Sequence, residues 1–267
     1  MINNNIYFSI IVVSLNTKKK LHNTLESIYR QKIYPKNYEI IVIDGMSVDG
    51  TQEEILKKNN NIDKLIIEQD TGIYDAMNKG IKYANGEWII FLNSGDLFYK
   101  NDVLRKIHSY KLNENDVIYG DTVVDNKKLK YRINGKVFNE NCINIPFCHQ
   151  SSFVKSHLLK KYNFDLEYKI CSDFDFFIKV KKKSKFFKKV NLIISTVEGG
   201  GLSDKRRFTA FIENSKIILK NKLLFKNFLK ITYFFLLLLF GQFLKIMLPN
   251  IIIQQILRKK YKKIIIN

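Results

Sequence analysis

The sequence has little of several residue types. Proline occurs three times in 267 residues, and cysteine also three times. The cysteines, Cys142, Cys148 and Cys171, form no C-x-x-C pair and are odd in number, which argues against a disulfide framework and suits a reducing compartment. The apolar stretch near the start lacks a preceding basic region and a cleavage site, so it is expected to be a strand rather than a signal peptide.

Acidic residues are scarce toward the C-terminal end. Residues 205–267 hold 14 Lys and Arg against one acidic residue, a net charge of +13 out of +20 for the whole chain, whereas residues 1–154 carry only +2. Such a basic segment fits nucleic acid, an anionic membrane surface or an acidic partner, and the charge alone does not choose among them.

Short β-branched runs alternate with helical patterns over the first hundred residues. This alternation predicts βαβ units and a mostly parallel sheet flanked by helices, an α/β fold of Rossmann-like type. The expected strands are 8–15, 38–43, 65–67 and 87–92, and the expected helices begin near Leu21, Thr51 and Tyr74.

Two aspartates follow expected strands. Asp44 comes directly after the second strand, and Asp96 follows the fourth across the turn Asn93-Ser94-Gly95. Either residue alone is an ordinary turn former. Ligands bind outside the carboxyl ends of parallel strands, however, so the pair together indicates a ligand site at one edge of the sheet.

Beyond about Asn113 the regular alternation ends. Short strands are expected at 117–119, 122–124 and 129–133, in a mixed region. A helix with an apolar stripe then begins near Ser172 and Asp173, where an aspartate also suits a helix N-terminus. The chain after Asp204 reads as helical, basic and hydrophobic at once.

Six segments, in order, resemble the family 2 glycosyltransferases of the GT-A fold. The strongest is EQDTGIYDAMNKGIKYANGEWIIFLNSGD at 68–96, similar to the branch that builds bacterial exopolysaccharides, capsules and lipopolysaccharide. The others are FSIIVVSLN at 8–16, IIVIDGMSVDGT at 40–51, HQSSFV at 149–154, CSDFDFFIKV at 171–180 and EGGGLS at 198–203. The resemblance covers about residues 7–215, leaving 216–267 as a separate helical tail.

This resemblance implies an enzyme that uses a nucleotide-diphosphate sugar, with UDP as the expected nucleotide. It places Asp44 opposite the uracil imide. Lys79 is expected near the phosphates, although an exposed helix lysine explains it equally well. The residues expected to bind the donor are Val13, Ser14, Leu15, Asn16, Asp44, Asp70, Asp75, Asn78, Lys79, Ser94 and, at the acceptor or donor, His149.

The resemblance also implies a divalent ion, Mg²⁺ or Mn²⁺, at Asp96, although the usual D-x-D element is reduced here to Asn-Ser-Gly-Asp. Asp173 corresponds to the catalytic base of the family, with Asp175 as the neighbour most easily confused with it. One base and one displacement predict inversion at the anomeric carbon. The glycines at 199–201 fit a mobile loop or a plain connector.

The tail is expected to lie on the inner face of a cell membrane, where a lipid-linked acceptor would be met. Its run at 231–244 is shorter than the roughly twenty apolar residues of a spanning helix. A short span and a helical pair packed on the enzyme remain alternatives. The rival functions are a catalytically inactive sugar-nucleotide-binding protein, a nucleotidyltransferase, for which a glycine-rich loop after the first strand is missing, and a nucleic-acid-binding protein, for which no motif is found.

Overall fold

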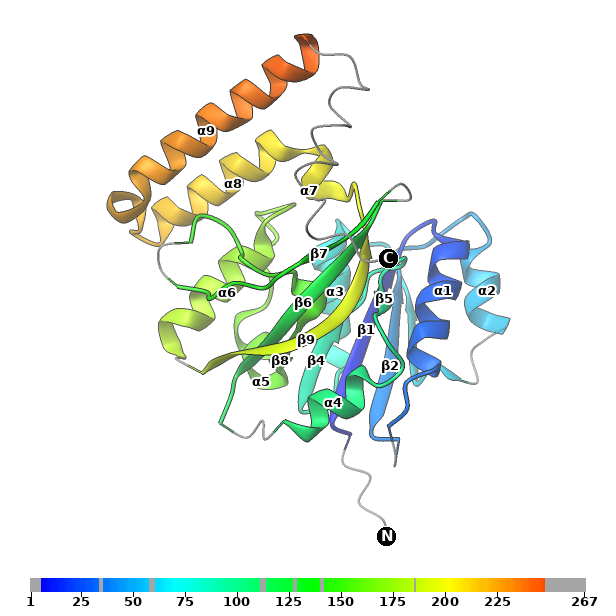
Figure 1. Cartoon of the computed structure of the whole chain (residues 1–267). Helices are drawn as coiled ribbons and strands as arrows, with labels where there is room; N and C mark the ends of the chain where they lie inside the picture. Colours follow the sequence, from blue (N-terminus) through cyan, green and yellow to red (C-terminus); the bar gives the residue numbers. More distant parts are fainter. Residues whose placement is uncertain are drawn as a thin grey trace.

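The structure is a computed structural model that describes residues 6–33, 36–57, 61–110, 114–126, 129–139, 142–184 and 186–247. It shows one mixed sheet with helices on both faces and a helical hairpin at one end (Figure 1). The strands are β1 (Phe8–Ser14), β2 (Tyr38–Asp44), β3 (Lys64–Ile67), β4 (Trp88–Phe91), β5 (Leu97–Phe98), β6 (Val117–Asp125), β7 (Lys130–Ile133), β8 (Ser152–Lys155) and β9 (Phe187–Glu198).

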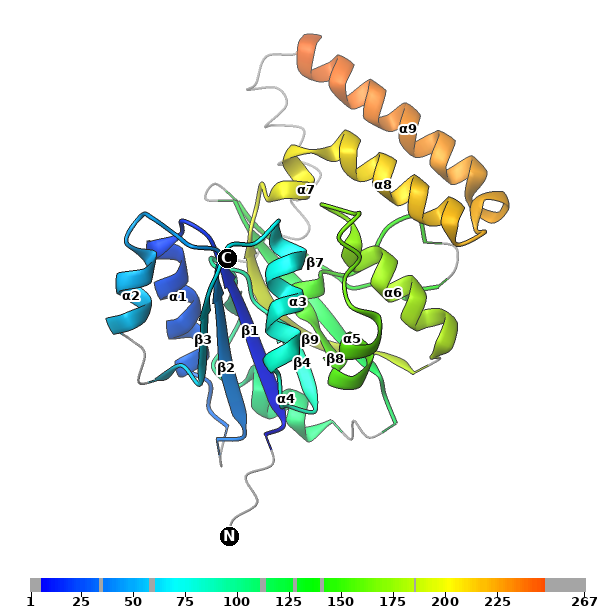
Figure 2. The same cartoon turned by 180° about the vertical axis from the view of Figure 1, so that it is seen from behind.

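The helices occupy both sides of this sheet (Figures 1 and 2). They are α1 (Lys18–Tyr29), α2 (Thr51–Lys57), α3 (Ile73–Tyr83), α4 (Val103–Ser109), α5 (Ser156–Tyr162), α6 (Ser172–Lys183), α7 (Leu202–Lys205), α8 (Arg207–Lys220) and α9 (Leu224–Met247), with a 3-10 turn η2 (His149–Ser151).

Strand order explains where the functional loops meet. The order is β3-β2-β1-β4-β8-β6-β9-β5, with β7 paired to β6. The first four strands of this order are parallel, and Asp44 lies in register with Ser14 on one side and Ile67 on the other. The carboxyl ends of β1, β2 and β4 are therefore neighbours at one edge, as expected from the sequence.

Alternation along β1 separates two cores. Phe8, Ile10 and Val12 point into a cluster with α1, α2 and α4, whereas Ile11 and Val13 point into a cluster with α3, α5, α6 and α8. Both faces of the strand are thus buried, and this is why β1 reads as a continuous apolar run rather than as an alternating one.

The second half differs in detail from the sequence prediction. The two short strands expected at 117–119 and 122–124 are one nine-residue strand, β6, which carries an irregularity in its pairing with β9 between Tyr119 and Thr122. Strand β9 was not predicted from the sequence. It pairs with β6 in parallel.

The expected boundary between residues 215 and 216 falls inside α8. This helix buries Ile217 and Ile218 in the same core cluster as α6. Helix α9 packs back on α8 through aromatic contacts of Phe211 with Phe234 and Phe235. In the described part of the chain, no helix combines the length and apolar character needed to cross a membrane. The last part of the expected tail, residues 248–267, lies outside the described residues.

Candidate active site

The loops after β1 and β2 are held together by side-chain hydrogen bonds. Asp44 is fully buried, and its two carboxylate oxygens accept from the amide and the hydroxyl of Ser47, at 2.8 and 2.7 Å. The Ser47 hydroxyl in turn accepts from the amide of Asn16 at 2.7 Å, and Asn16 Oδ1 accepts from the amide of Val48 at 2.9 Å. The buried Asp44 carboxylate therefore fixes the turn at the expected nucleotide site through Ser47.

Backbone conformation in these loops is unusual for residues other than glycine. Asn16 and Met46 both have positive φ, at 51° and 65°. Such angles are uncommon and occur mostly where surrounding contacts fix them, often at ligand sites. Here the fixing contacts are the hydrogen bonds between the two loops.

Backbone groups bring the remaining residues of this edge together. The amide of Gly45 donates to Ser14 at 2.9 Å, and the amide of Ser94 donates to Val13 at 2.9 Å. Leu15 is half exposed, and a Cβ added at Gly45 would collide with the Asp70 carboxylate and approach Leu15. Val13, Ser14, Leu15, Asn16, Asp44, Asp70 and Ser94 thus lie at one edge of the sheet.

The charged residues before and within α3 bond to one another and to the nearby backbone. Asp70 accepts from the amide of Gly72, and Asp75 accepts from the amide of Thr71, both at 2.9 Å, so these carboxylates shape the start of α3. Lys79 donates to the carbonyl of Gln69 at 2.5 Å and pairs with Glu68 and Asp75.

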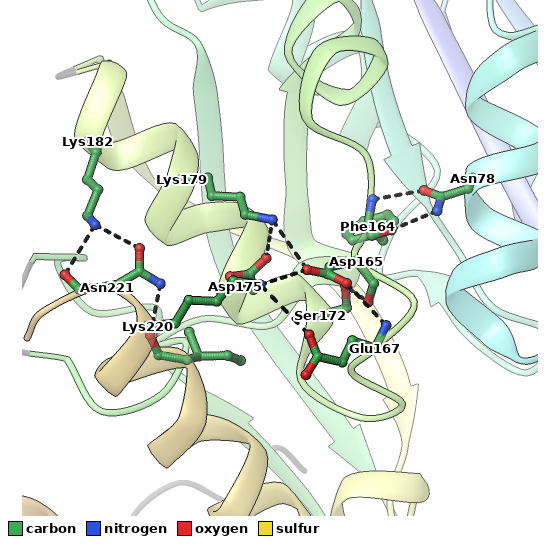
Figure 3. Close-up of polar contacts among 11 residues, drawn as sticks. Asn78, Phe164, Asp165, Glu167, Ser172, Asp175, Lys179, Lys182, Lys220 and Asn221 are labelled. Atoms are coloured by element: carbon green, nitrogen blue, oxygen red, sulfur yellow. Dashed lines mark hydrogen bonds and ion pairs between the residues drawn. The ribbon is translucent and has the colours of Figure 1, made fainter.

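Asn78 is occupied away from the sheet edge. Its amide donates to the carbonyl of Phe164 at 2.8 Å and accepts from the amide of the same residue at 2.9 Å (Figure 3). Both the nitrogen and the oxygen of the Asn78 amide therefore bind the loop before α6. We do not include Asn78 in the proposed donor site.

Asp96 is buried in the turn between β4 and β5. Burial raises the pKa of Asp96 to about 6, against the lowering effects of nearby His149, of a hydrogen bond from the Gln150 side chain and of backbone amides. Gln150 Oε1 accepts from the Cys148 thiol at 2.6 Å, which leaves the amide nitrogen of Gln150 to face Asp96. The carboxylate is thus surrounded by donors and one neighbouring imidazole.

Asp173 lies at the start of α6 with both oxygens engaged. Its Oδ1 accepts from the amide of Phe174 at 2.9 Å and lies 3.0 Å from the phenol of Tyr74, whose single hydrogen is shared between Oδ1 and the carbonyl of Ile170. Its Oδ2 is 3.2 Å from His149 Nδ1. Burial raises the pKa of Tyr74 well above its usual value, so the phenol stays protonated and donates. His149 therefore pairs with Asp173, and its charge also lowers the pKa of Asp96.

Asp175, by contrast, belongs to the scaffold. It is fully buried and pairs with Lys179 one helical turn later, at 2.5 Å. Of the two aspartates in this run, only Asp173 is connected to His149 and to the sheet edge.

The protein offers few ligands for a divalent ion at this site. Among the described residues, no three His, Cys, Asp or Glu side chains gather into a metal cage. The turn does contain Asp96 and the buried Asn93 Oδ1, which has no hydrogen-bond partner in the described part of the structure. Mg²⁺ is commonly held by one or two protein oxygens, substrate phosphates and water. These two oxygens therefore fit an ion bound mainly through a diphosphate.

Several residues of the site escape prediction from sequence. Ser47, Tyr74 and Gln150 each bond to one of the three aspartates. Ser47, Tyr74 and Gln150 all lie inside segments that resemble the family, so their position within these motifs was an available signal. Glu213, described below, carried a different signal, since it is the single acidic residue after Asp204.

Taken together, the geometry supports group transfer at the carboxyl edge of the sheet. One side offers ordered loops and backbone amides suited to a nucleotide, and the other offers a carboxylate, Asp173, suited to accept a proton. Asp96 lies between them, where negative charge on a diphosphate would need compensation.

Comparisons with known proteins agree with this geometry. The sequence signature of glycosyl transferase family 2 matches residues 9–185. The PGL/p-HBAD biosynthesis glycosyltransferase of Mycobacterium tuberculosis (strain ATCC 25177 / H37Ra) is 30% identical over 210 residues, which are 74% of this chain and 79% of that protein. The minor teichoic acid biosynthesis protein GgaB of Bacillus subtilis (strain 168) is 29% identical over 75% of this chain but only 22% of its own length.

Solved structures share the fold. S. aureus TarS in complex with UDP-GlcNAc superposes with a TM-score of 0.63 at 17% identity, covering 80% of this chain and 66% of that one. Glucosyl-3-phosphoglycerate synthase of M. tuberculosis, solved with Mn²⁺ and UDP, gives 0.53 at 13% identity, covering 77% of each chain. The present chain thus spans just under two thirds of the TarS chain, and at these identities the likeness concerns the GT-A fold.

Proposed function

The chain belongs to glycosyl transferase family 2, and on that premise we propose that it transfers a sugar from a UDP-sugar to a hydroxyl of a glycan or lipid-linked acceptor in cell-surface glycan synthesis. The observation that carries this proposal is the pair of His149 and Asp173, 3.2 Å apart, on a fold whose loops after β1 and β2 are ordered by hydrogen bonds. The UDP and UDP-GlcNAc complexes of TarS support the choice of donor class.

The donor site is proposed at the carboxyl ends of β1, β2 and β4. Uridine would lie on the loops at 13–16 and 44–48, with Asp44 holding the turn through Ser47. Ser94 and the start of α3, with Asp70 and Asp75, would flank the sugar diphosphate. Lys79 is paired with Glu68 and Asp75 and would approach the phosphates only by leaving them.

Asp173 is proposed as the base. An acceptor hydroxyl is too weak a nucleophile unless its proton is removed as the bond to the anomeric carbon forms, and a carboxylate within hydrogen-bond reach can remove it. Oδ1 is occupied by Tyr74 and Phe174, so the proton would go to Oδ2, the oxygen that faces His149. His149 would then orient Oδ2 and share the proton. A single displacement of this kind inverts the anomeric configuration.

Departure of the nucleoside diphosphate places negative charge next to Asp96. A divalent ion bound there would neutralise that charge. Mn²⁺ in the glucosyl-3-phosphoglycerate synthase structure supports this assignment. Asp96 and Asn93 would hold the ion on the protein side, and Gln150 would keep Asp96 in place.

A donor screen tests the proposed reaction. Purified protein is incubated with Mn²⁺, an acceptor-containing bacterial membrane extract and a panel of UDP- and GDP-sugars, and nucleoside diphosphate release is measured. We expect release with at least one UDP-sugar and an inverted linkage by NMR of the product. Binding of UDP-sugars without turnover would instead identify a sugar-nucleotide-binding protein.

We also propose that the α8–α9 hairpin rests on an anionic membrane surface. The outer face of α9 exposes Leu229, Tyr233, Leu236 and Phe240, spaced at helical intervals, with exposures from 57 to 81%. A cavity of about 400 Å³ next to α9 is lined by Leu237 and Leu238 of that helix and, around the start of α8, by Asp204, Lys205, Arg206 and Arg207. Apolar residues next to cations are the composition of an interfacial helix pair.

Vesicle sedimentation tests this surface. Binding to vesicles containing phosphatidylglycerol should exceed binding to phosphatidylcholine alone, and should weaken with salt. The double variant Leu229→Ser, Leu236→Ser should lose vesicle binding. Leu56→Ser, the same change at an exposed leucine of α2, should keep it. Heparin retention without any vesicle binding would favour a nucleic-acid partner instead.

A further inference from the structure

Glu213 is the single acidic residue between Lys205 and the C-terminus, yet it does not face solvent. It lies in α8 with 8% of its surface exposed. Its carboxylate accepts three backbone hydrogen bonds, from the amides of Lys169 at 3.0 Å and of Ile170 and Cys171 at 2.9 Å. Among the described residues, no exposed cation of the tail forms an ion pair with Glu213. Its negative charge is therefore stabilised by the three backbone amides.

The three amides belong to the segment that leads into α6. Cys171 immediately precedes α6, and Asp173 is the second residue of that helix. The carbonyl of Ile170 accepts from the Tyr74 phenol at 2.7 Å, and the same phenol lies 3.0 Å from Asp173 Oδ1. One carboxylate on α8 therefore fixes the peptide that, through Tyr74, is connected to the proposed base.

Helix α8 is also held at its C-terminal end. Lys182 of α6 donates to the side-chain oxygen of Asn221 at 2.7 Å, and Lys220 pairs with Asp165 at 3.2 Å (Figure 3). These contacts are more exposed than those of Glu213. They align α8 against α6, so that Glu213 meets the amides at a fixed place.

We propose that Glu213 is a positioning residue for Asp173. Its hydrogen bonds fix the 169–171 segment, and this keeps the Asp173 carboxylate in one orientation relative to Tyr74 and His149. This inference rests on the proposed function, because it presumes that Asp173 is the base. It also makes α8 a part of the catalytic apparatus rather than of a detachable tail.

The variant Glu213→Gln tests this assignment. Glutamine keeps the length of the side chain, but it loses the charge and places an NH₂ group against amide donors. The matched control is Glu167→Gln, which removes one carboxylate charge from the loop that Glu213 binds, at a side chain that is 64% exposed and 3.8 Å from Lys220. Glu213→Asp, which keeps the charge on a shorter side chain, serves as a second variant if Glu213→Gln folds poorly.

Three measurements separate positioning from a purely structural role. The stoichiometry of UDP binding by calorimetry gives the fraction of intact sites, and kcat is divided by that fraction. We expect corrected kcat to fall about 10- to 100-fold in Glu213→Gln, with donor KM within about twofold, since small misplacement of a catalytic group has effects of this size. Glu213→Asp should recover part of the loss.

The third measurement does not require turnover. The imidazole NMR signals of His149, assigned with His149→Gln, report on the group 3.2 Å from Asp173. They should shift in Glu213→Gln and stay unchanged in Glu167→Gln. Unchanged His149 signals, or a corrected kcat equal to that of the control, would overturn the proposal. If wild-type protein turns over no donor, the proposed function fails, while the His149 signals still decide whether Glu213 positions the pair.

Discussion

The two sides of the proposed active site, the nucleotide side and the side of the proposed base, are assembled in different ways. On the nucleotide side, the loops at 13–17 and 44–51 follow adjacent parallel strands and bond to each other directly. On the side of the base, Asp173 meets Tyr74 across 99 residues of sequence, and the segment before it is held by Glu213 across more than forty. Strand pairing therefore builds the first side, and helix packing builds the second.

This difference has functional consequences. Adjacent parallel strands bring their loops together in any such sheet, so the nucleotide side is a general feature of the fold. The side of the base depends on how α3, α6 and α8 pack, and it lies next to the hairpin that we assign to a membrane surface. Changes on the two sides should therefore affect different kinetic constants.

The largest effect is expected from the side of the base. Asp173→Asn should lower kcat by about 10³-fold, within the range for loss of a general base, while UDP affinity stays within about threefold. Asp175→Asn is the matched control, since Asp175 is buried beside Lys179 in the same helix turn. It should lower the melting temperature but keep most of kcat. Equal losses of kcat in the two variants would contradict the assignment.

Asp96 sits between the two sides, and its titration should be visible in binding. Because burial raises the pKa of Asp96 to about 6, the carboxylate gains a proton as pH falls through 6. Affinity for Mn²⁺ with an intact UDP-sugar, which lacks the terminal phosphate of UDP that titrates near pH 6, should then fall by up to about tenfold per pH unit below this value, and stay level above it. Calorimetry from pH 5 to 8 measures this, and Asp96→Asn should give weak binding without that slope.

A smaller effect is expected on the nucleotide side. Ser47→Ala removes the hydroxyl that joins Asp44 to Asn16, so the turn should lose order while the base is untouched. Donor KM should rise about tenfold, the equivalent of one hydrogen bond, with kcat within about twofold. Initial-rate measurements over a range of donor concentrations test this. A fall in kcat alone would mean that the two sides are not separable in this way.

The smallest effect concerns stability. The raised pKa of Asp96 means that the folded state prefers the neutral carboxyl, so the ionised group destabilises the metal-free protein above about pH 6. Asp96→Asn should therefore stabilise it by about 1–2 kcal/mol at pH 7.5, and less as pH falls toward 4. Denaturant titrations at several pH values show this trend.

The matched control for that trend is Asp102→Asn. A hydrogen bond from Lys106 lowers the pKa of Asp102, so this carboxylate stabilises the fold when ionised. Its replacement should destabilise the protein at neutral pH and lose its effect on acidification. The same sign for both variants would indicate that titration is not the cause.

Particular residues show what the sequence could and could not predict. Asp44, Asp96 and Asp173 were identified because two follow strands in an alternating pattern and all three lie in segments that resemble the family. Asn78 lies in the strongest of those segments, yet its amide is bound to Phe164, 86 residues away. Membership of a motif does not say which way a side chain points.

By itself the sequence determined the parallel half of the sheet, the edge at which the ligand site is proposed and the family, because hydrophobic periodicity and strand-end residues are local properties. Only the tertiary structure decided which side chains complete the site. Tyr74, Gln150 and Glu213 act through hydrogen bonds between elements distant in sequence, and such bonds depend on packing angles that no local pattern encodes. The acidic residue of the basic tail is visible in the sequence, but its hydrogen bonds to the 169–171 segment depend on how α8 packs against α6.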